Sequence, residues 1–157
     1  MEPFVVKIRA ARESERASLG DLALRSKAHW DYSQDFLDAC RDELSVPALH
    51  DPDSRVFVAE HDASHVVGFY RLARSSPQQA ELTHCFVEPS RIGRGVGRLL
   101  VAHAAGEARR LGYAGLIIQS DPNAAPFYRA LGARDTGTRP SDSIPGRSLP
   151  LLVLDLR

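Results

Sequence analysis

The sequence predicts a mixed α/β domain with a central, mostly antiparallel sheet of about seven strands and about four helices. Three observations lead to this prediction. Short segments rich in β-forming residues recur along the chain, and two helical segments separate the first predicted strand from the second. A glycine-rich loop after the fourth predicted strand leads into an amphipathic helix. An apolar segment typical of a central strand follows that helix, which gives a parallel strand–helix–strand unit within the sheet. We expect residues 1–157 to form a single domain.

The first half of the chain supplies the antiparallel part of the sheet. Phe4–Arg9 predicts a short strand, and the acidic residues after Ala11 are typical of a helix start, with the helix running to about Ser26. Ser33 can cap a second helix, from Gln34 to about Leu44. Three strands follow, the first two as a hairpin across the turn His61–His65: Arg55–Glu60, Val66–Arg74 and Ala80–Val87.

The second half of the chain contains the parallel unit and the C-terminal strands. A helix is predicted from Gly97 to Leu111, because apolar side chains recur on one face and Gly112 is a typical stop. Ala114–Gln119 is apolar enough for a central strand. The remaining predicted elements are a short helix, Asn123–Leu131, and two strands, Arg134–Thr138 and Leu149–Leu156, separated by the loop Arg139–Arg147.

Composition narrows the classes of function. Hydrophobic residues make up 43% and charged residues 25% of the chain, and the formal net charge is zero. A zero balance argues against a nucleic-acid surface, which usually carries a clustered basic excess. No apolar run is long enough to span a membrane, so we expect no membrane partner. Cys40 and Cys85 are far apart and lack metal-site spacing, so we expect no metal ion and a reduced, cytoplasmic setting.

The stretch Val87–Leu100 is the most informative part of the sequence. A proline turn ends the fourth strand, and alternating glycines and two arginines then lead into the helix: Gly93, Arg94, Gly95, Gly97 and Arg98. Glycines allow backbone N–H groups to approach a ligand closely, and a helix start adds unpaired donors and the positive end of the helix dipole. The stretch therefore predicts an anion site, for which a pyrophosphate fits best.

Spacing excludes two phosphate-binding motifs. A P-loop needs a lysine followed by serine or threonine after its last glycine, and no such lysine is present. A dinucleotide fingerprint that begins at Gly93 and Gly95 needs a glycine where Arg98 stands. Two interpretations remain. The stretch is either a third kind of phosphate-binding motif or a glycine-rich turn before a surface helix that binds no ligand.

That third motif is the acyl-CoA loop of the GNAT N-acetyltransferases, Gln/Arg-x-x-Gly-x-Gly/Ala after the fourth strand, which the stretch resembles. Gly95 and Gly97 take the two small positions, whereas Ile92 stands where the family prefers a polar residue. The resemblance therefore implies that the backbone, Arg94 and Arg98 hold the ligand.

A second segment, Asp121–Ala133, also resembles this family. The family pattern is Asn-x-x-Ala-x-x-aromatic-Tyr-x-x-x-Gly-Phe, and four positions match: Asn123, Phe127, Tyr128 and Gly132. Pro126 and Ala133 depart from it. The predicted order of strands and helices is also that of the GNAT fold. Further stretches resemble a subgroup of small bacterial GNAT proteins without a settled acceptor: Ser26–Tyr32, Glu81–Val87, Ser120–Pro122 and Ser143–Pro150.

The resemblance implies an acyltransferase that uses acetyl-CoA as co-substrate. The residues implied to bind it are Phe86, Val87, Gly93, Arg94, Gly95, Val96, Gly97, Arg98, Asn123 and Phe127. The pantetheine would add to the edge of the fourth strand by strand-like pairing. Backbone N–H groups near Val87 would stabilise the oxyanion. Tyr128 is the family's usual acid, and we expect it to hydrogen-bond the leaving thiolate, because full proton transfer from a phenol to a thiolate is uphill by roughly 2 kcal/mol.

An amine must lose a proton before it attacks, so a general base is needed. Glu81, His84 or a water relay can supply it. In a regular strand Glu81 and His84 face opposite sides, and a bulge between them would change that. Either side chain can also have a purely structural role.

The acceptor is predicted to be a primary amine on a small molecule. Trp30, His29 and Arg147 are candidates for its binding site, with Lys27 and Tyr32 nearby. Arg147 would suit a carboxylate or phosphate on the acceptor. Acetylation of a protein or peptide, and a non-catalytic acyl-CoA sensor, are the alternatives. The sequence leaves the oligomeric state open between a monomer and a homodimer.

Overall fold

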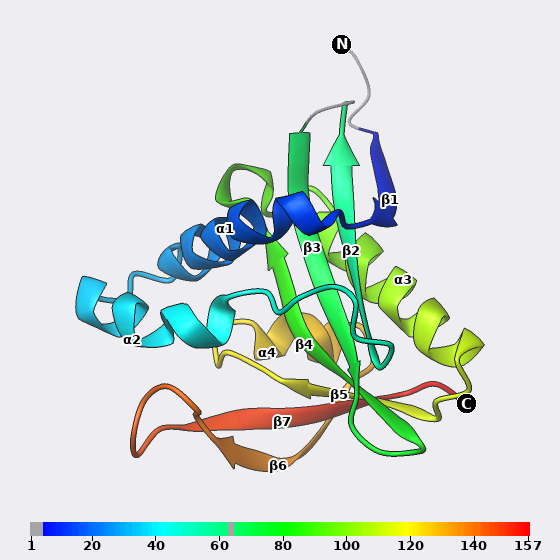
Figure 1. Cartoon of the computed structure of the whole chain (residues 1–157). Helices are drawn as coiled ribbons and strands as arrows, with labels where there is room; N and C mark the ends of the chain where they lie inside the picture. The colour runs from blue at the N-terminus through cyan, green and yellow to red at the C-terminus, as the bar shows by residue number, and fades with distance from the viewer. Residues whose placement is uncertain (1–4, 63–64) are drawn as a thin grey trace.

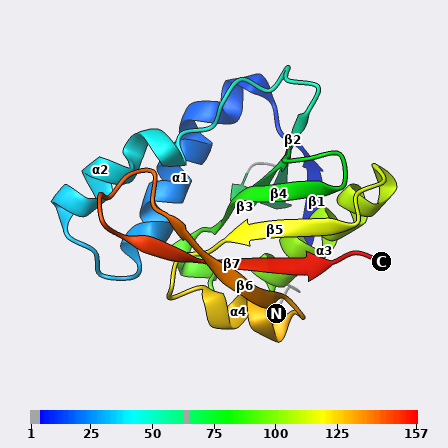
Figure 2. The same cartoon turned by 90° about the horizontal axis from the view of Figure 1, so that it is seen from below.

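The protein is described by a computed structural model that covers residues 5–62 and 65–157, with one seven-stranded sheet between two layers of helices (Figures 1 and 2). The strands are β1 (Val6–Ala10), β2 (Ser54–His61), β3 (His65–Arg74), β4 (Gln79–Val87), β5 (Gly115–Gln119), β6 (Arg134–Pro140) and β7 (Ser148–Asp155). The helices are α1 (Arg16–Ala28), α2 (Gln34–Leu44), α3 (Val96–Arg110) and α4 (Ala125–Ala130), with 3-10 turns η1 (Glu13–Glu15) and η2 (Pro89–Arg91).

The strand order in the sheet is β1-β2-β3-β4-β5-β7-β6. β4 and β5 are parallel, and the other neighbouring pairs are antiparallel. The helix α3 makes the connection between the two parallel strands, as such a pair requires. The mixed α/β fold predicted from the sequence is therefore confirmed, including its parallel unit.

The two parallel strands separate soon after they begin. β4 pairs with β5 only from Gln79–Gly115 to Glu81–Ile117, although β4 continues to Val87. Figure 1 shows the two arrows diverging from this point. A wedge-shaped gap therefore opens in the middle of the sheet, between the second half of β4 and the end of β5.

A β-bulge lies in β4 where the gap opens. Leu82 pairs with Leu72 of β3 and His84 with Arg71, so Thr83 is an extra residue. Ala80 and Leu82 belong to the core beneath α3, whereas His84 contacts the ring of Phe69 on the opposite face. The bulge thus reverses the alternation of side chains along the strand.

Each face of the sheet has its own hydrophobic core. The α3-side core lies between the sheet and α3 with α4, and it includes Tyr70, Leu100, Leu116 and Tyr128. The α1-side core lies beneath α1 and α2, and its buried members include Leu19, Leu22, Cys40, Val58 and Phe69. The interruption of pairing between β4 and β5 lies between these two cores.

The predicted helix boundaries agree with the structure to within two residues, except at the start of α1. The second helix spans the expected Gln34–Leu44, and Ser33 Oγ accepts the Phe36 N–H at 3.2 Å as its cap. The first helix was expected from Ala11 but begins at Arg16, because Arg12 is extended and the Glu15 carboxylate accepts its N–H at 2.8 Å. The expected strand residue Phe4 and the turn residues Ala63 and Ser64 lie outside the described residues.

Within the part of the chain that the structure describes, no helix is both long and apolar enough to cross a lipid bilayer.

Candidate active site

The glycine loop lies at the N-terminus of α3, next to the end of β4. Gly93 and Gly95 have φ of +82° and +86°, a region that strongly favours glycine. A Cβ atom added at either residue would meet nothing within 4 Å, so both face open space. The first loop-to-helix hydrogen bond runs from the Leu99 N–H to the Gly95 carbonyl at 3.1 Å, which leaves the preceding amides to point out of the helix start.

Charged and apolar side chains surround this loop. Arg94 and Arg98 are both exposed to solvent, and the side chain of Ile92 is 41% exposed. Gly97 lies against the ring of Phe127, because a Cβ at this position would come within 3.2 Å of the Phe127 ring and 3.7 Å of Val87. The loop, the end of β4 and α4 thus meet at one place and form a cradle with the chemistry of an anion site.

Tyr128 lies on the same side of the sheet, at the gap. It is 7% exposed, and its hydroxyl interacts electrostatically with the Cys85 thiol of β4. Burial raises the pKa of the Tyr128 phenol well above its usual range, and it raises the pKa of the Cys85 thiol to about 12. Both groups therefore remain protonated at neutral pH.

Glu81 lies on the opposite face of β4. Its neighbours Ala80 and Leu82 belong to the α3-side core, so its side chain points toward the α1 side. The carboxylate accepts a hydrogen bond from Arg139 Nη1 at 3.0 Å, and the same nitrogen reaches Gln119 Oε1 at 3.2 Å. Glu81 is thus a partly shielded carboxylate at the point where β4 leaves β5.

His84 lies on the same face as Glu81 because of the bulge at Thr83. It is 6% exposed, and its Nε2 lies 3.2 Å from the Ser45 carbonyl oxygen. Because a carbonyl can only accept a hydrogen bond, Nε2 carries the proton of the neutral ring. Nδ1 is then free to accept the Thr83 hydroxyl at 2.9 Å. Burial lowers the pKa of His84 to about 4, so the ring is neutral at neutral pH and both of its nitrogens are engaged.

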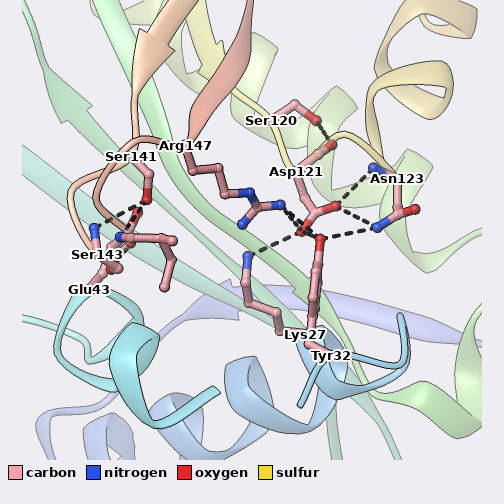
Figure 3. A network of polar contacts seen from close by, with 10 residues as sticks. Lys27, Tyr32, Glu43, Ser120, Asp121, Asn123, Ser141, Ser143 and Arg147 are labelled. Atoms are coloured by element: carbon pink, nitrogen blue, oxygen red, sulfur yellow. Dashed lines mark hydrogen bonds and ion pairs between the residues drawn. The ribbon is translucent and has the colours of Figure 1, made fainter. Parts of the chain in front are cut away.

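Asp121, just after β5, holds together residues from several loops (Figure 3). Its Oδ2 accepts hydrogen bonds from the Tyr32 hydroxyl at 2.8 Å and from Lys27 Nζ at 3.2 Å, and Arg147 Nη2 lies 3.8 Å away. Its Oδ1 accepts the backbone N–H of Asn123 at 2.8 Å and the side-chain amide at 3.0 Å. These partners keep the pKa of Asp121 below its usual range although burial opposes this.

The C-terminal turn of α1 spans the mouth of the gap. Arg25 forms two hydrogen bonds with Glu88, the residue after β4, at 3.0 and 2.7 Å. Lys27, two residues later, pairs with Asp121 beyond the end of β5. The Arg25 side chain is 52% exposed and its pair is screened by solvent, whereas Lys27 and Asp121 are each 13% exposed. The Lys27 pair therefore contributes most of this ionic link.

The other predicted acceptor residues differ in their positions. Arg147 donates to the Tyr32 hydroxyl at 2.9 Å, and its guanidinium lies 4.8 Å from the Phe36 ring centre, so it belongs to the Asp121 network. His29 and Trp30 are exposed, with ring centres 5.1 Å apart, and they make no hydrogen bond to that network within the described residues.

Asn123 is expected from the sequence to bind the co-substrate. In this structure its side-chain amide donates a hydrogen bond to the Tyr32 hydroxyl at 3.1 Å.

The sequence analysis gave no role to Asp121, Arg139 or Cys85. Asp121 had a local signal, because an Asp-Pro pair directly after a buried strand is a typical turn. Arg139 had no local signal, because its partner Glu81 is 58 residues away in the sequence. Cys85 had none either, because its partner Tyr128 lies on a different element.

Comparisons with known proteins agree on one family. The family pattern described as "Acetyltransferase (GNAT) family" matches residues 20–133. Peptidyl-lysine N-acetyltransferase YjaB of Escherichia coli K12 is 32% identical over 153 residues, which are 96% of this chain and 97% of that protein. The YjaB protein of Salmonella typhimurium is 31% identical, with 96% and 98% coverage.

Solved structures share the fold. PaiA N-acetyltransferase from Thermoplasma acidophilum, in complex with coenzyme A, has a TM-score of 0.76 at 16% identity and covers 96% of this chain and 99% of that one. YncA from Salmonella typhimurium, with acetyl-CoA, has a TM-score of 0.68 at 22% identity, with 98% and 95% coverage.

The lowered pKa of His84 predicts a pH dependence of stability. The unfolded chain binds a proton on this ring below pH 6.5, whereas the folded chain does so only near pH 4. The free energy of unfolding should therefore fall by about 3 kcal/mol from this group as the pH drops through that window. In His84→Gln this contribution is absent. Urea unfolding of both proteins at several pH values should show a shallower acid decline for the variant, and parallel declines would contradict the burial of a neutral ring.

Proposed function

Because the chain belongs to the GNAT acetyltransferase family, we propose that it moves an acetyl group from acetyl-CoA to a primary amine, and that this amine is a lysine side chain of a protein. The observation that carries the proposal is the gap between β4 and β5. It joins a glycine-lined anion cradle on the α3 side to a face with a carboxylate, Glu81, on the α1 side. Two substrates that enter from opposite faces can therefore meet at one place.

The cradle fits the pyrophosphate of acetyl-CoA. The positive-φ glycines face open space, the amides at the start of α3 point outward, and Arg94 and Arg98 are exposed beside them. Phosphate oxygens can accept from these N–H groups and are attracted by both arginines. The free edge of β4 at Phe86 and Val87 suits strand-like pairing with the pantetheine amides, and Phe127 offers an apolar wall. The thioester supplies the acetyl group in activated form.

We assign Glu81 as the general base, acting directly or through a water molecule. Glu81 is partly exposed on the α1 side and lies where the strands part. His84 shares that face, but its nitrogens are both engaged and its pKa is about 4, so it is the weaker candidate and better suited to support the bulge. Arg139 would hold the Glu81 carboxylate in place.

We assign Tyr128 as a hydrogen-bond donor to the departing thiolate. Its raised pKa opposes full loss of the phenol proton, so it would stabilise negative charge on sulfur mainly through its hydrogen bond. The nearby Cys85 thiol is consistent with this role, because it places a sulfur atom of β4 in the surroundings of the Tyr128 hydroxyl. Backbone N–H groups of β4 around Val87 would serve the oxyanion.

Two acceptor classes have support. A peptidyl lysine is favoured by the YjaB proteins, whose names give that substrate and which match nearly the whole chain. A small-molecule amine, the acceptor expected from the sequence, is favoured by the loop between β6 and β7, which crosses the α1 side and is held by contacts of Ser143 with Glu43 and of Arg147 with Tyr32 (Figure 3). A screen of lysine peptides and small amines that measures thiol release from acetyl-CoA distinguishes them.

Gly95→Asp should weaken binding of acetyl-CoA. The new carboxylate would stand in the cradle and repel the pyrophosphate, so we expect affinity to fall at least about tenfold by calorimetry. Gly106→Asp is the matched control, because Gly106 is an exposed glycine of the same helix with open space around it. Unchanged binding by Gly95→Asp would contradict the pyrophosphate assignment.

Tyr128→Phe should lower turnover and leave the affinity for acetyl-CoA nearly unchanged. Loss of one donor to a developing charge typically costs about 100-fold in kcat. Steady-state kinetics and calorimetry on the same preparation separate the two effects. A variant that turns over normally would remove Tyr128 from the mechanism, and one that no longer binds acetyl-CoA would make it a structural residue.

Glu81→Gln should reduce kcat about 100-fold at neutral pH, because the amide cannot accept the proton of the acceptor ammonium. Raising the pH should restore part of the rate, since an alkylamine with a pKa of about 10.4 then loses its proton to solvent. His84→Gln serves as the comparison. If His84→Gln loses the rate and Glu81→Gln does not, the two assignments must be exchanged.

A further inference from the structure

The chain is poor in lysine. It contains only Lys7 and Lys27, and all its other basic side chains are arginines apart from histidine. Arginine cannot serve as an acetyl acceptor at neutral pH because its guanidinium does not deprotonate. The two lysines are therefore the only side-chain amines in the sequence that acetyl-CoA could modify.

Lys27 lies at the mouth of the gap between β4 and β5. The turn of α1 that carries it is tied to both strands, through Arg25 to Glu88 after β4 and through Lys27 itself to Asp121 after β5. Figure 3 shows the Lys27 amine pointing at the Asp121 carboxylate from the α1 side. This is the side of the sheet that carries Glu81, the residue assigned as general base. The nitrogen thus stands where an acceptor amine would enter.

The surroundings of Lys27 resemble a binding site for an alkylammonium group. The nitrogen lies 3.2 Å from Asp121 Oδ2 and 5.5 and 5.8 Å from the ring centres of Tyr32 and Phe36. The two rings stack at 4.1 Å, and a carboxylate beside aromatic faces is a favourable site for such a cation. Lys27 therefore occupies its own chain's acceptor side much as a substrate lysine would.

Lys27 can move away from Asp121 without leaving the Asp121 carboxylate unpaired. Arg147 Nη2 is already 3.8 Å from the same carboxylate oxygen, and the Tyr32 hydroxyl donates to it at 2.8 Å. This oxygen would keep two partners, and Oδ1 would keep its contacts with Asn123, when the lysine moves away on its flexible four-carbon stem. Glu43 on α2 is engaged by the Ser143 hydroxyl.

We propose that Lys27 is a site of self-acetylation, in which each molecule acetylates its own Lys27; this rests on the proposed transfer of acetyl groups to lysine. The Lys27 nitrogen bonds to the acetyl carbon, and the carbon–sulfur bond breaks with its electron pair going to sulfur. The Lys27 ammonium gives up two protons. One passes to solvent through the general base Glu81, and the other ends on the sulfur of CoA, which leaves as the thiol. The products are Nε-acetyl-Lys27 and free CoA.

Acetylation would change the acceptor side in a defined way. It removes the positive charge that pairs with Asp121, and it places a neutral amide at the mouth of the gap. The link between α1 and the end of β5 would lose its main ion pair, and entry of an external amine would be hindered. Self-acetylation is thus expected to reduce turnover of external acceptors.

The test is incubation of the purified full chain with isotopically heavy acetyl-CoA, followed by mass spectrometry of the intact protein and of its peptides. The heavy label distinguishes new acetyl groups from those added during expression. We expect one heavy acetyl group on Lys27, with the modified fraction at a given time independent of protein concentration. Lys27→Arg should abolish the label, and Lys7→Arg, the matched control, should leave it unchanged.

Enzymatic and chemical acetylation give opposite patterns. Lys7 is exposed on β1, whereas Lys27 is ion-paired and 13% exposed, so spontaneous acetylation favours Lys7. Tyr128→Phe should slow labelling of Lys27 at least about tenfold. Labelling that is fastest at Lys7, that is insensitive to Tyr128→Phe, or that accelerates with protein concentration would overturn the proposal.

A lysine peptide included in a parallel reaction separates the two proposals. If the peptide is acetylated and Lys27 is not, self-acetylation is wrong and the proposed function stands. If neither is acetylated although acetyl-CoA binds, the proposed lysine acceptor is wrong and self-acetylation is wrong with it.

Discussion

The parting of β4 from β5 is the constraint on which the rest of the site depends. Once the strands separate beyond Glu81 and Ile117, the backbone groups on that edge of β4 lack a neighbouring strand, and an edge inside a protein must find another partner. An extended ligand with amide groups can take the place of that strand. The same parting places residues from both faces of the sheet around one interruption of the strand pairing. The proposed site therefore depends on incomplete strand pairing.

The bulge at Thr83 decides which side chains of β4 face the α1 side. In a regular strand Glu81 and His84 would point to opposite faces, and the sequence alone could not say whether a bulge intervenes. Such a bulge depends on how β3 and β4 pair, in particular on Arg71 and Leu72 lying opposite His84 and Leu82. The structure therefore brings both candidate bases to one face, and burial then separates them by leaving Glu81 partly exposed and His84 enclosed.

Local patterns were sufficient for most of the fold and for the position of the glycine loop at the start of α3. Ser33 as a cap and the glycines before α3 are signals within a few residues, and each predicted its element correctly. The acceptor side had no comparable signal, because the network around Asp121 combines α1, the loop after it, the β5–α4 loop and the β6–β7 loop. Lys27 and Asp121 are 94 residues apart, and only the packing of α1 across the parted strands brings them together.

Asp121 divides its two oxygens between the two sides of the gap. Oδ1 fixes the turn at Asn123 from which α4 begins, and α4 carries Tyr128. Oδ2 holds Tyr32 and Lys27 on the α1 side. The Asn123 side-chain amide bonds both Oδ1 and the Tyr32 hydroxyl, whereas the Asn123 backbone N–H bonds Oδ1 alone. An amine that displaces Lys27 from Oδ2 would therefore leave this backbone contact at the start of α4 in place. In the proposed mechanism, Asp121 would thus allow the α1 side to rearrange while α4 keeps Tyr128 in position.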